Sequence, residues 1–323
     1  MFPVERALLM INRSAGTGQD GSVIGKLSSV FKQDLGGLFE VKVELVRDHA
    51  DARTRAAGFI SESEAPALIV VGGGGGTLRA VIEGIYDTRA TERVRVGALR
   101  MGSGNLLAIK FGAPRDPLLA LQGLLLNLKA GRTVPCCVMR GETWTSSGKS
   151  EVHHAVSLGG LGQFGRNPSD LVRWRARLSL FHRCAARLFG LERVNNTEYA
   201  FAFLIRFLSC VLFRNRAETV EVRGERFRLL SGFVMNFPIA ALPFKPRVTV
   251  EDETLSVYLI PLWGHIRRLR IEKNKPLDIR FVDRDQVELF LDEDPVTTSK
   301  QLRLSVAGSI AFVPGPDYRG VSA

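Results

Sequence analysis

The sequence predicts two domains: an α/β domain at residues 1–131 and a mainly β domain, a sandwich, at residues 132–323. Three observations favour this division. The 323 residues exceed what one hydrophobic core usually serves. Over the first part of the chain, apolar strand-like runs alternate with helix-like periodicity, which is typical of a parallel sheet covered by helices. After Gly131, strand-like runs joined by turns dominate instead.

The α/β domain begins with a short apolar run and then alternates regularly between the two patterns. Its predicted strands are 7–11, 39–46, 67–72 and 95–101. Its predicted helices are 22–35, 50–61, a third that begins at Thr77, and 116–131. Because ligands of open α/β sheets bind at the carboxyl ends of the strands, we expect a ligand site in the loops that follow these strands.

The mainly β domain consists of strand-rich stretches separated by turn residues. These stretches are 133–147, 150–160, 218–237, 247–262, 276–294 and 302–315. A mainly helical insert is predicted at about 168–214, and the last strand could return towards the first domain.

Charge and composition restrict the partners and the compartment. A formal net charge of +11 attracts phosphorylated ligands and anionic membranes, whereas no helix-turn-helix, zinc-finger or aromatic RNA-binding signature predicts a nucleic-acid partner. Four cysteines without metal-ligand spacing are typical of a reducing, cytoplasmic compartment. The apolar run 199–213 is shorter than a membrane span and contains Arg206. We therefore expect a cytoplasmic chain that does not cross the bilayer; a homodimer remains open.

Three predicted strands lead into polar or glycine-rich loops. Five consecutive glycines, Gly72–Gly76, separate the third strand from the helix that begins at Thr77. A tight turn needs one or two glycines, so we interpret the excess as a loop whose backbone N–H groups approach a phosphate. Gly102–Asn105 forms a second junction of this kind, with Asn105 placed as an N-cap, and Asn12–Gly16 follows the first strand. Together these loops favour a nucleotide site.

These loops resemble motifs of the diacylglycerol kinase catalytic family, which includes sphingosine kinases and bacterial lipid kinases and is distantly similar to NAD kinases. The family motifs N-P-x-(S/A)-G, G-G-D-G-T and P-x-G-(T/S)-x-N are matched by Asn12, Ser14 and Gly16; by Gly73, Gly74, Gly76 and Thr77; and by Gly102, Ser103 and Asn105. Later matches are Asn236, Asp252, Leu255 and the run 292–294. The resemblance covers nearly the whole chain and implies the two-domain fold of these kinases.

The resemblance implies ATP-dependent phosphorylation of a hydroxyl group on a diacylglycerol-like or sphingoid lipid, with Mg²⁺ as the metal. The glycine loops, Gly75 included, would hold the nucleotide phosphates. The resemblance also implies that the chain binds peripherally to the inner face of the membrane. A carboxylate can accept the proton of the lipid hydroxyl. By motif position this is Asp292, with Asp294 or Glu293 orienting metal or water, and Asp252 and Asp294 as metal ligands. The competing interpretation of 292–294 is a solvated turn before Pro295.

The chain departs from the family at several acidic positions. Gly75 replaces the aspartate of the glycine motif, Ala80 replaces a glutamate, Leu106 replaces an aspartate, and Glu293 replaces a late glycine. A backbone phosphate cradle needs no side chain, but metal binding and proton transfer do. Two alternatives therefore stay open: a catalytically degenerate relative that binds nucleotide or lipid in a regulatory role, and an NAD kinase.

The predicted insert carries a basic amphipathic pattern. Residues 166–193 contain seven arginines, and apolar residues recur there at helical spacing: Trp174, Leu178, Phe181, Ala185 and Leu188. Such a helix can lie on an anionic membrane that holds the lipid substrate, or it can pack its apolar stripe on the β domain.

Overall fold

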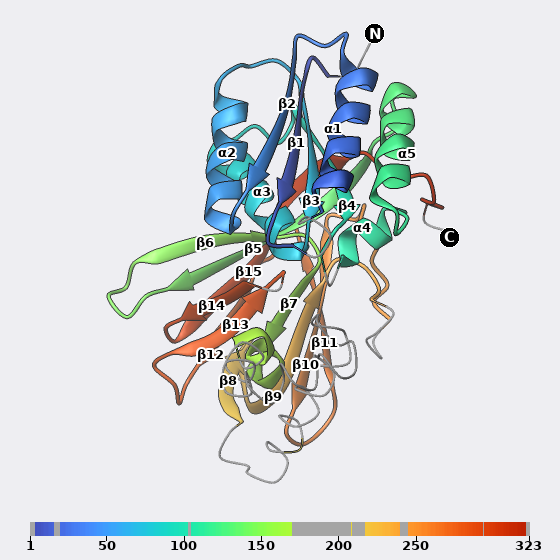
Figure 1. The fold of residues 1–323 in the computed structure, drawn as a ribbon. Coiled ribbons are helices and arrows are strands. Elements are labelled where there is room, and N and C mark those ends of the chain that lie inside the picture. Colours follow the sequence, from blue (N-terminus) through green and yellow to red (C-terminus); the bar gives the residue numbers. More distant parts are fainter. Residues whose placement is uncertain are drawn as a thin grey trace, which may run out of the picture. The chain divides into compact units, whose positions relative to one another are not determined.

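The computed structural model describes residues 4–15, 20–102, 105–169, 208, 217–239, 245–292 and 294–320 (Figure 1). The chain divides into two compact units. Unit 1 comprises Met1–Cys137, Thr249–Glu251 and Ser309–Ala323, and unit 2 comprises Val138–Val248 and Asp252–Gly308. In the described part of the chain, no helix is long and apolar enough to cross a membrane. The predicted insert lies outside the described residues, except for residues 168, 169 and 208.

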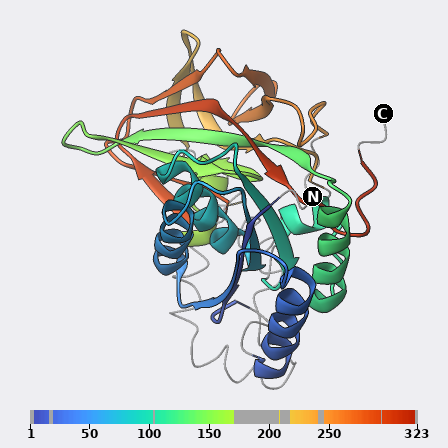
Figure 2. The ribbon, with the colours of Figure 1, turned by 90° about the horizontal axis from the view of Figure 1, so that it is seen from above.

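Unit 1 is a parallel α/β sheet, as the alternating pattern predicted. Its strands are β1 (Arg6–Asn12), β2 (Glu40–Val46), β3 (Ala67–Gly73) and β4 (Val94–Arg100), in the spatial order β4-β3-β1-β2. Its helices are α1 (Gly21–Leu35), α2 (His49–Ser61), α3 (Gly75–Asp87), α4 (Leu106–Lys110) and α5 (Pro117–Lys129). Figures 1 and 2 show α1 and α5 on one face of these strands and α2 and α3 on the other. The end of β15 (Gln301–Phe312) adds a parallel strand beside β4.

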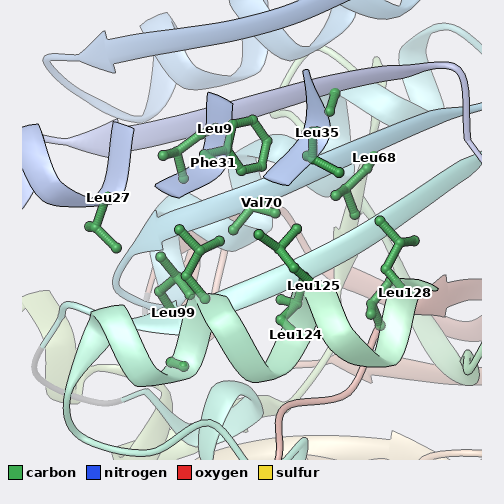
Figure 3. Close-up of a cluster of buried hydrophobic side chains, with 14 of the residues drawn as sticks. Leu9, Leu27, Phe31, Leu35, Leu68, Val70, Leu99, Leu124, Leu125 and Leu128 are labelled. Carbon is green, nitrogen blue, oxygen red and sulfur yellow. The ribbon is translucent and has the colours of Figure 1, made fainter. Parts of the chain in front are cut away.

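The core under α1 and α5 follows directly from the periodicity of the sequence (Figure 3). Leu27, Phe31 and Leu35 recur every four residues and face the sheet from α1, and leucines of α5 do the same. These helical residues, with Leu124, Leu125 and Leu128 from α5, pack against alternate residues of the strands, among them Leu9, Leu68, Val70 and Leu99. Each such side chain stabilises the fold by roughly 1.5–3 kcal/mol through burial.

The helix beginnings differ in a way that matters for the ligand site. Asp20, Asp48 and Asp116 cap α1, α2 and α5, because each carboxylate accepts hydrogen bonds from backbone N–H groups of the first turn. Helix α3 begins at Gly75, two residues before the predicted Thr77, and its N-cap Gly74 offers no side chain. The prediction of Thr77 was wrong because tertiary packing overrides the low helix propensity of glycine. The first turn of α3 thus has no side-chain cap.

Unit 2 is a mainly antiparallel β domain, and with unit 1 it confirms the predicted fold class of an α/β domain followed by a β-rich region. Strands β14-β13-β7-β9-β8-β12-β15 follow one another in its sheet, β10 and β11 extend it from β9, and β5 and β6 pair beyond β15. Their bounds are β5 (Val134–Trp144), β6 (Ser150–Ala155), β7 (Leu158–Leu161), β8 (Glu218–Val222), β9 (Glu225–Met235), β10 (Thr254–Pro261), β11 (Arg267–Glu272), β12 (Leu277–Phe281), β13 (Val287–Leu291) and β14 (Asp294–Thr298). A one-turn helix, α6 (Gly162–Gly165), follows β7.

Candidate nucleotide site

The carboxyl ends of the parallel strands bring the predicted loops of unit 1 to one edge. Asn12, the last residue of β1, lies in register with Val46 of β2. Gly73, the last residue of β3, lies in register with Arg100 of β4. The polar loop after β1, the glycine loop after β3 and the loop after β4 therefore meet, as expected for a ligand site in an open α/β sheet. Gly16 and Ser103 lie outside the described residues.

In the glycine loop, backbone atoms and not side chains are available to contact a ligand. Gly74 is extended, with φ −91° and ψ −174°, and the chain enters α3 directly after it. A Cβ atom added at Gly102 would overlap the Cα atom of Gly74 and lie 2.7 Å from its backbone nitrogen. The two glycine loops therefore touch through their backbones. Uncapped N–H groups at the start of a 13-residue helix carry partial positive charge and suit a phosphate group.

Asn12 and Thr77 bind each other inside unit 1. The amide nitrogen of Asn12 donates a 2.8 Å hydrogen bond to Oγ1 of Thr77, and Asn12 Oδ1 accepts another from the backbone N–H of Ser14. Both Asn12 and Thr77 are buried. Ser14 Oγ in turn donates to the carbonyl of Arg47, which follows β2. These side chains join the loop after β1 to helix α3 and to the end of β2, so they position the glycine loop.

Asn105 occupies the predicted N-cap position of α4, but its side chain bonds within its own loop and not to the helix. Its backbone is left-handed, with φ 49° and ψ 24°, and its side chain makes no capping bond to α4. Instead, its Oδ1 accepts a 3.0 Å hydrogen bond from the backbone N–H of Gly102, and its amide nitrogen donates to the carbonyl of Gly102. Asparagine tolerates the left-handed region and bonds readily to nearby backbone. This pair of bonds fixes Gly102 against Gly74.

Arg100 is a site residue that the sequence interpretation missed. It ends β4 beside Gly73, and its Nε atom is buried without a hydrogen-bond partner among the described residues. Burial, and then repulsion by Arg115, lower the pKa of Arg100. The signal was present in the sequence, because Arg100 occupies the first position of the stretch that resembles P-x-G-(T/S)-x-N. Arg13 and Arg47, both exposed, follow β1 and β2, and Arg47 forms a 3.7 Å ion pair with Asp51.

The carboxylates near this edge serve the fold. Position 75 is glycine, position 80 is a buried alanine and position 106 is leucine. Asp20 and Asp48 each use one carboxylate oxygen, Oδ1, to cap a helix. Among the described residues, no three histidine, cysteine or acidic side chains gather where they could hold a metal ion. Because Mg²⁺ prefers carboxylate ligands, the donor set of this edge does not fit a Mg²⁺ ion held by unit 1.

Asp292 in unit 2 is buried, and its carboxylate holds the loop between β6 and β7. One oxygen accepts hydrogen bonds from the N–H groups of Ser157 at 2.8 Å and Leu158 at 3.0 Å and from the Ser157 hydroxyl. The other oxygen accepts one from the N–H group of Val156. Asn236 donates to the carbonyl of Val156 at 2.9 Å. The structure thus joins two motif residues, Asp292 and Asn236, through a loop that the sequence interpretation did not single out.

Two other acidic motif residues of unit 2, Asp252 and Asp294, are half-buried. Asp294 begins β14 opposite Leu291, and its side chain is half-buried. Asp252 precedes β10, and its backbone carbonyl accepts a hydrogen bond from the N–H group of Thr254. Glu293 lies outside the described residues. The catalytic and metal-binding roles predicted for these three residues stay predictions.

Replacing Asp292 by asparagine should destabilise the chain, by about 2–4 kcal/mol. The new amide group would present N–H donors to N–H donors of the β6–β7 loop, so hydrogen bonds to a charged acceptor are lost. Urea denaturation of the purified chain measures this loss. The control Asp285→Asn, at a carboxylate whose side chain is 91% exposed and pairs with Lys300 at the surface, should change stability by less than about 0.5 kcal/mol. Equal stability of Asp292→Asn and the unmodified chain would contradict a structural role.

Comparison with known proteins agrees with this geometry. The family model of the diacylglycerol kinase catalytic domain matches residues 6–135, which include the loops after β1, β3 and β4. Over these residues, the chain is similar to the diacylglycerol kinase catalytic domain. No curated protein sequence matches the chain.

Solved structures extend the similarity in fold to nearly the whole chain. A candidate diacylglycerol kinase from Bacillus anthracis strain Sterne is 16% identical, with a TM-score of 0.66, and the match covers 98% of this chain and 97% of that one. A diacylglycerol kinase from the same organism is 16% identical, with a TM-score of 0.61, and covers 97% of this chain and 98% of its own. The two-unit architecture of this chain is therefore the architecture of these proteins.

Proposed function

We propose that this chain is an ATP-dependent lipid kinase that phosphorylates a hydroxyl group of a diacylglycerol-like or sphingoid lipid. The observation that carries the proposal is the backbone cradle of unit 1. There the glycine loop ends at a helix start without a capping side chain, and Gly102 packs against Gly74. Similarity of residues 6–135 to the diacylglycerol kinase catalytic domain supports a lipid acceptor.

The cradle suits the phosphates of ATP by its charge as well as its shape. Backbone N–H groups at the start of α3 donate hydrogen bonds to phosphate oxygens. Arg100, whose Nε atom is buried without a partner in the described part of the chain, supplies a full positive charge beside Gly73. Burying the charge of Arg100 costs free energy, and an anionic group bound beside it would offset this cost. The phosphates are therefore held by backbone and arginine, with no protein-held metal at this edge.

In the proposed reaction, the lipid hydroxyl oxygen forms a bond to the γ-phosphorus of ATP. The bond from that phosphorus to the β–γ bridging oxygen breaks, ADP leaves, and the hydroxyl proton passes to a carboxylate. Asp292 is the candidate acceptor by motif position, and Asp294 is the candidate for orienting water or metal. Because the oxygens of Asp292 already accept hydrogen bonds, Ser157 would keep this carboxylate in place during the transfer.

Incubation of the full chain with γ-labelled ATP, Mg²⁺ and vesicles of mixed neutral lipids tests the proposal. A labelled phospholipid should form, together with an equal amount of ADP. Absence of any labelled lipid across diacylglycerols, monoacylglycerols, ceramides and sphingoid bases would overturn it. Formation of NADP from NAD in a parallel sample would instead identify an NAD kinase.

A second candidate function is binding without turnover, and the missing carboxylates at positions 75, 80 and 106 favour it. The variant Gly75→Asp distinguishes the two functions. If the chain is a degenerate relative, the variant should gain lipid phosphorylation that the unmodified chain lacks. Turnover by the unmodified chain would exclude this second function.

A further inference from the structure

Two neighbouring hairpin turns of unit 2 expose apolar and basic side chains together. The turn between β10 and β11 contains four consecutive exposed residues, Trp263 to Ile266, in which Trp263 is 67% and Ile266 is 43% exposed. The turn between β8 and β9 consists of Arg223 and Gly224, both with positive φ, as in the two-residue turns that suit a tight hairpin.

Direct contacts show that the two turns lie side by side. Arg267, the first residue of β11, forms a 2.9 Å ion pair with Glu225, the first residue of β9. The guanidinium carbon of Arg267 also lies 3.9 Å from the ring centre of Phe227. The backbone N–H group of Leu262 donates to the carbonyl of Arg228. In Figure 1, β8 to β11 accordingly run next to one another.

Basic side chains surround this pair of turns. The exposed or half-exposed arginines near the turns are Arg223, Arg226, Arg228, Arg267 and Arg268. Glu221 and Glu225 pair with Arg226 and Arg267, whereas Arg270 extends towards Thr254 at the other end of the hairpin. Arg268 and Arg270 alternate along β11, so both project from the same face of this strand. The turns therefore combine an exposed tryptophan with an excess of positive charge.

We propose that the β8–β9 and β10–β11 turns dock unit 2 on an anionic lipid bilayer. Tryptophan favours the boundary between headgroups and acyl chains, isoleucine favours the acyl side, and arginines around them attract anionic headgroups. A single exposed apolar residue would carry no such meaning, but an aromatic and an aliphatic residue at one turn with complementary charge around them do. The inference deepens the proposed function, because a lipid acceptor resides in a bilayer.

Sedimentation of the full chain with vesicles tests the docking surface without requiring turnover. Binding should be strong to vesicles of phosphatidylcholine with phosphatidylglycerol, weak to pure phosphatidylcholine, and reduced by 0.5 M NaCl. The double variant Trp263→Ser/Ile266→Ser should bind the anionic vesicles at least about tenfold more weakly. Phe39→Ser removes an aromatic side chain that is 87% exposed in unit 1, so it is the matched control and should bind normally.

Two further double variants test how much positive charge contributes to vesicle binding. Arg226→Gln/Arg268→Gln should weaken binding by about tenfold or more, since each arginine near an anionic surface contributes roughly a fivefold factor. Lys273→Gln/Lys275→Gln removes two exposed charges from the opposite end of β11 and should have a smaller effect. Circular dichroism of each variant shows whether it is folded.

Quenching of tryptophan fluorescence by brominated lipids gives an independent measurement of whether Trp263 reaches the acyl chains. All variants carry Trp174→Phe, which removes the tryptophan of the predicted amphipathic insert from the signal. In this background, the quenching should be lost in Trp263→Phe and retained in Trp144→Phe. Equal vesicle binding by Trp263→Ser/Ile266→Ser and the Phe39→Ser control, or quenching that persists in Trp263→Phe, would overturn the proposal. So would preferential binding of RNA or protein to the same arginines. If vesicle binding follows these expectations but no lipid is phosphorylated, the proposed function fails and the docking surface stands.

Discussion

Replacing Gly102 by alanine should abolish saturable binding of ATP and destabilise the chain by about 1–3 kcal/mol. The added methyl group would overlap the Cα atom of Gly74 and crowd its backbone nitrogen. Both obstacles are backbone atoms, so no side-chain rotation relieves the clash, and the two loops must separate. Separation moves the N–H groups at the start of α3 away from the phosphates. Isothermal titration with ATP and urea denaturation measure the two effects.

Gly58→Ala is the matched control for this substitution. Gly58 lies within α2, and a Cβ atom added there would meet nothing within 4 Å. Alanine in a helix interior stabilises relative to glycine, by about 0.5–1 kcal/mol, so this variant should be more stable and should bind ATP normally. Normal ATP binding by Gly102→Ala would show that the phosphates lie elsewhere.

Substitution of Arg100 by glutamine should lower the affinity for ATP by about tenfold to a hundredfold. This range corresponds to about 1.5–3 kcal/mol, the usual contribution of a hydrogen bond to a charged group. The effect should grow with the number of phosphates, so ATP should lose more affinity than AMP. Titrations with ATP, ADP and AMP measure this order.

Arg95→Gln provides the control on the same strand. Its Nε atom is also buried without a partner in the described part of the chain, but Arg95 lies near the start of β4, in register with Leu68. It lies five positions before Arg100 along the strand, roughly 16 Å away. This variant should therefore change stability without changing ATP affinity. Equal losses of affinity in both variants would argue against a specific contact at Arg100.

Much of unit 1 could be predicted because its signals are local. Alternation of apolar strands with residues spaced three and four apart predicted the parallel sheet, and the helices predicted at 22–35 and 116–131 are present as α1 and α5. Helix α3 begins earlier than predicted, since the helix propensity of glycine does not reflect the backbone contact with Gly102. Asn105 lies at the predicted N-cap position, but the sequence did not show that its side chain would bond to Gly102 in a left-handed loop.

The candidate site was harder to predict where its residues act over long distances in sequence. The bonds of Asp292 to Val156, Ser157 and Leu158 span more than 130 residues, and no local pattern announces them. Asp292 itself was predicted by motif position, but its contacts with the loop between β6 and β7 are visible only in the hydrogen bonds of the structure. Arg100 was not predicted, because a single arginine at the end of a strand has no distinctive spacing; its place beside Gly73 follows from the strand register.

Equilibrium binding of ATP to the full chain, measured in Mg²⁺ and again in excess EDTA, tests most directly whether the edge of unit 1 holds phosphates through backbone and arginine. We predict saturable binding in both, with dissociation constants within about threefold of each other, because the donor set there does not fit a protein-held metal. Binding that disappears in EDTA would contradict the account by showing that a metal ion holds the nucleotide. The absence of saturable binding in either condition would contradict the nucleotide site itself.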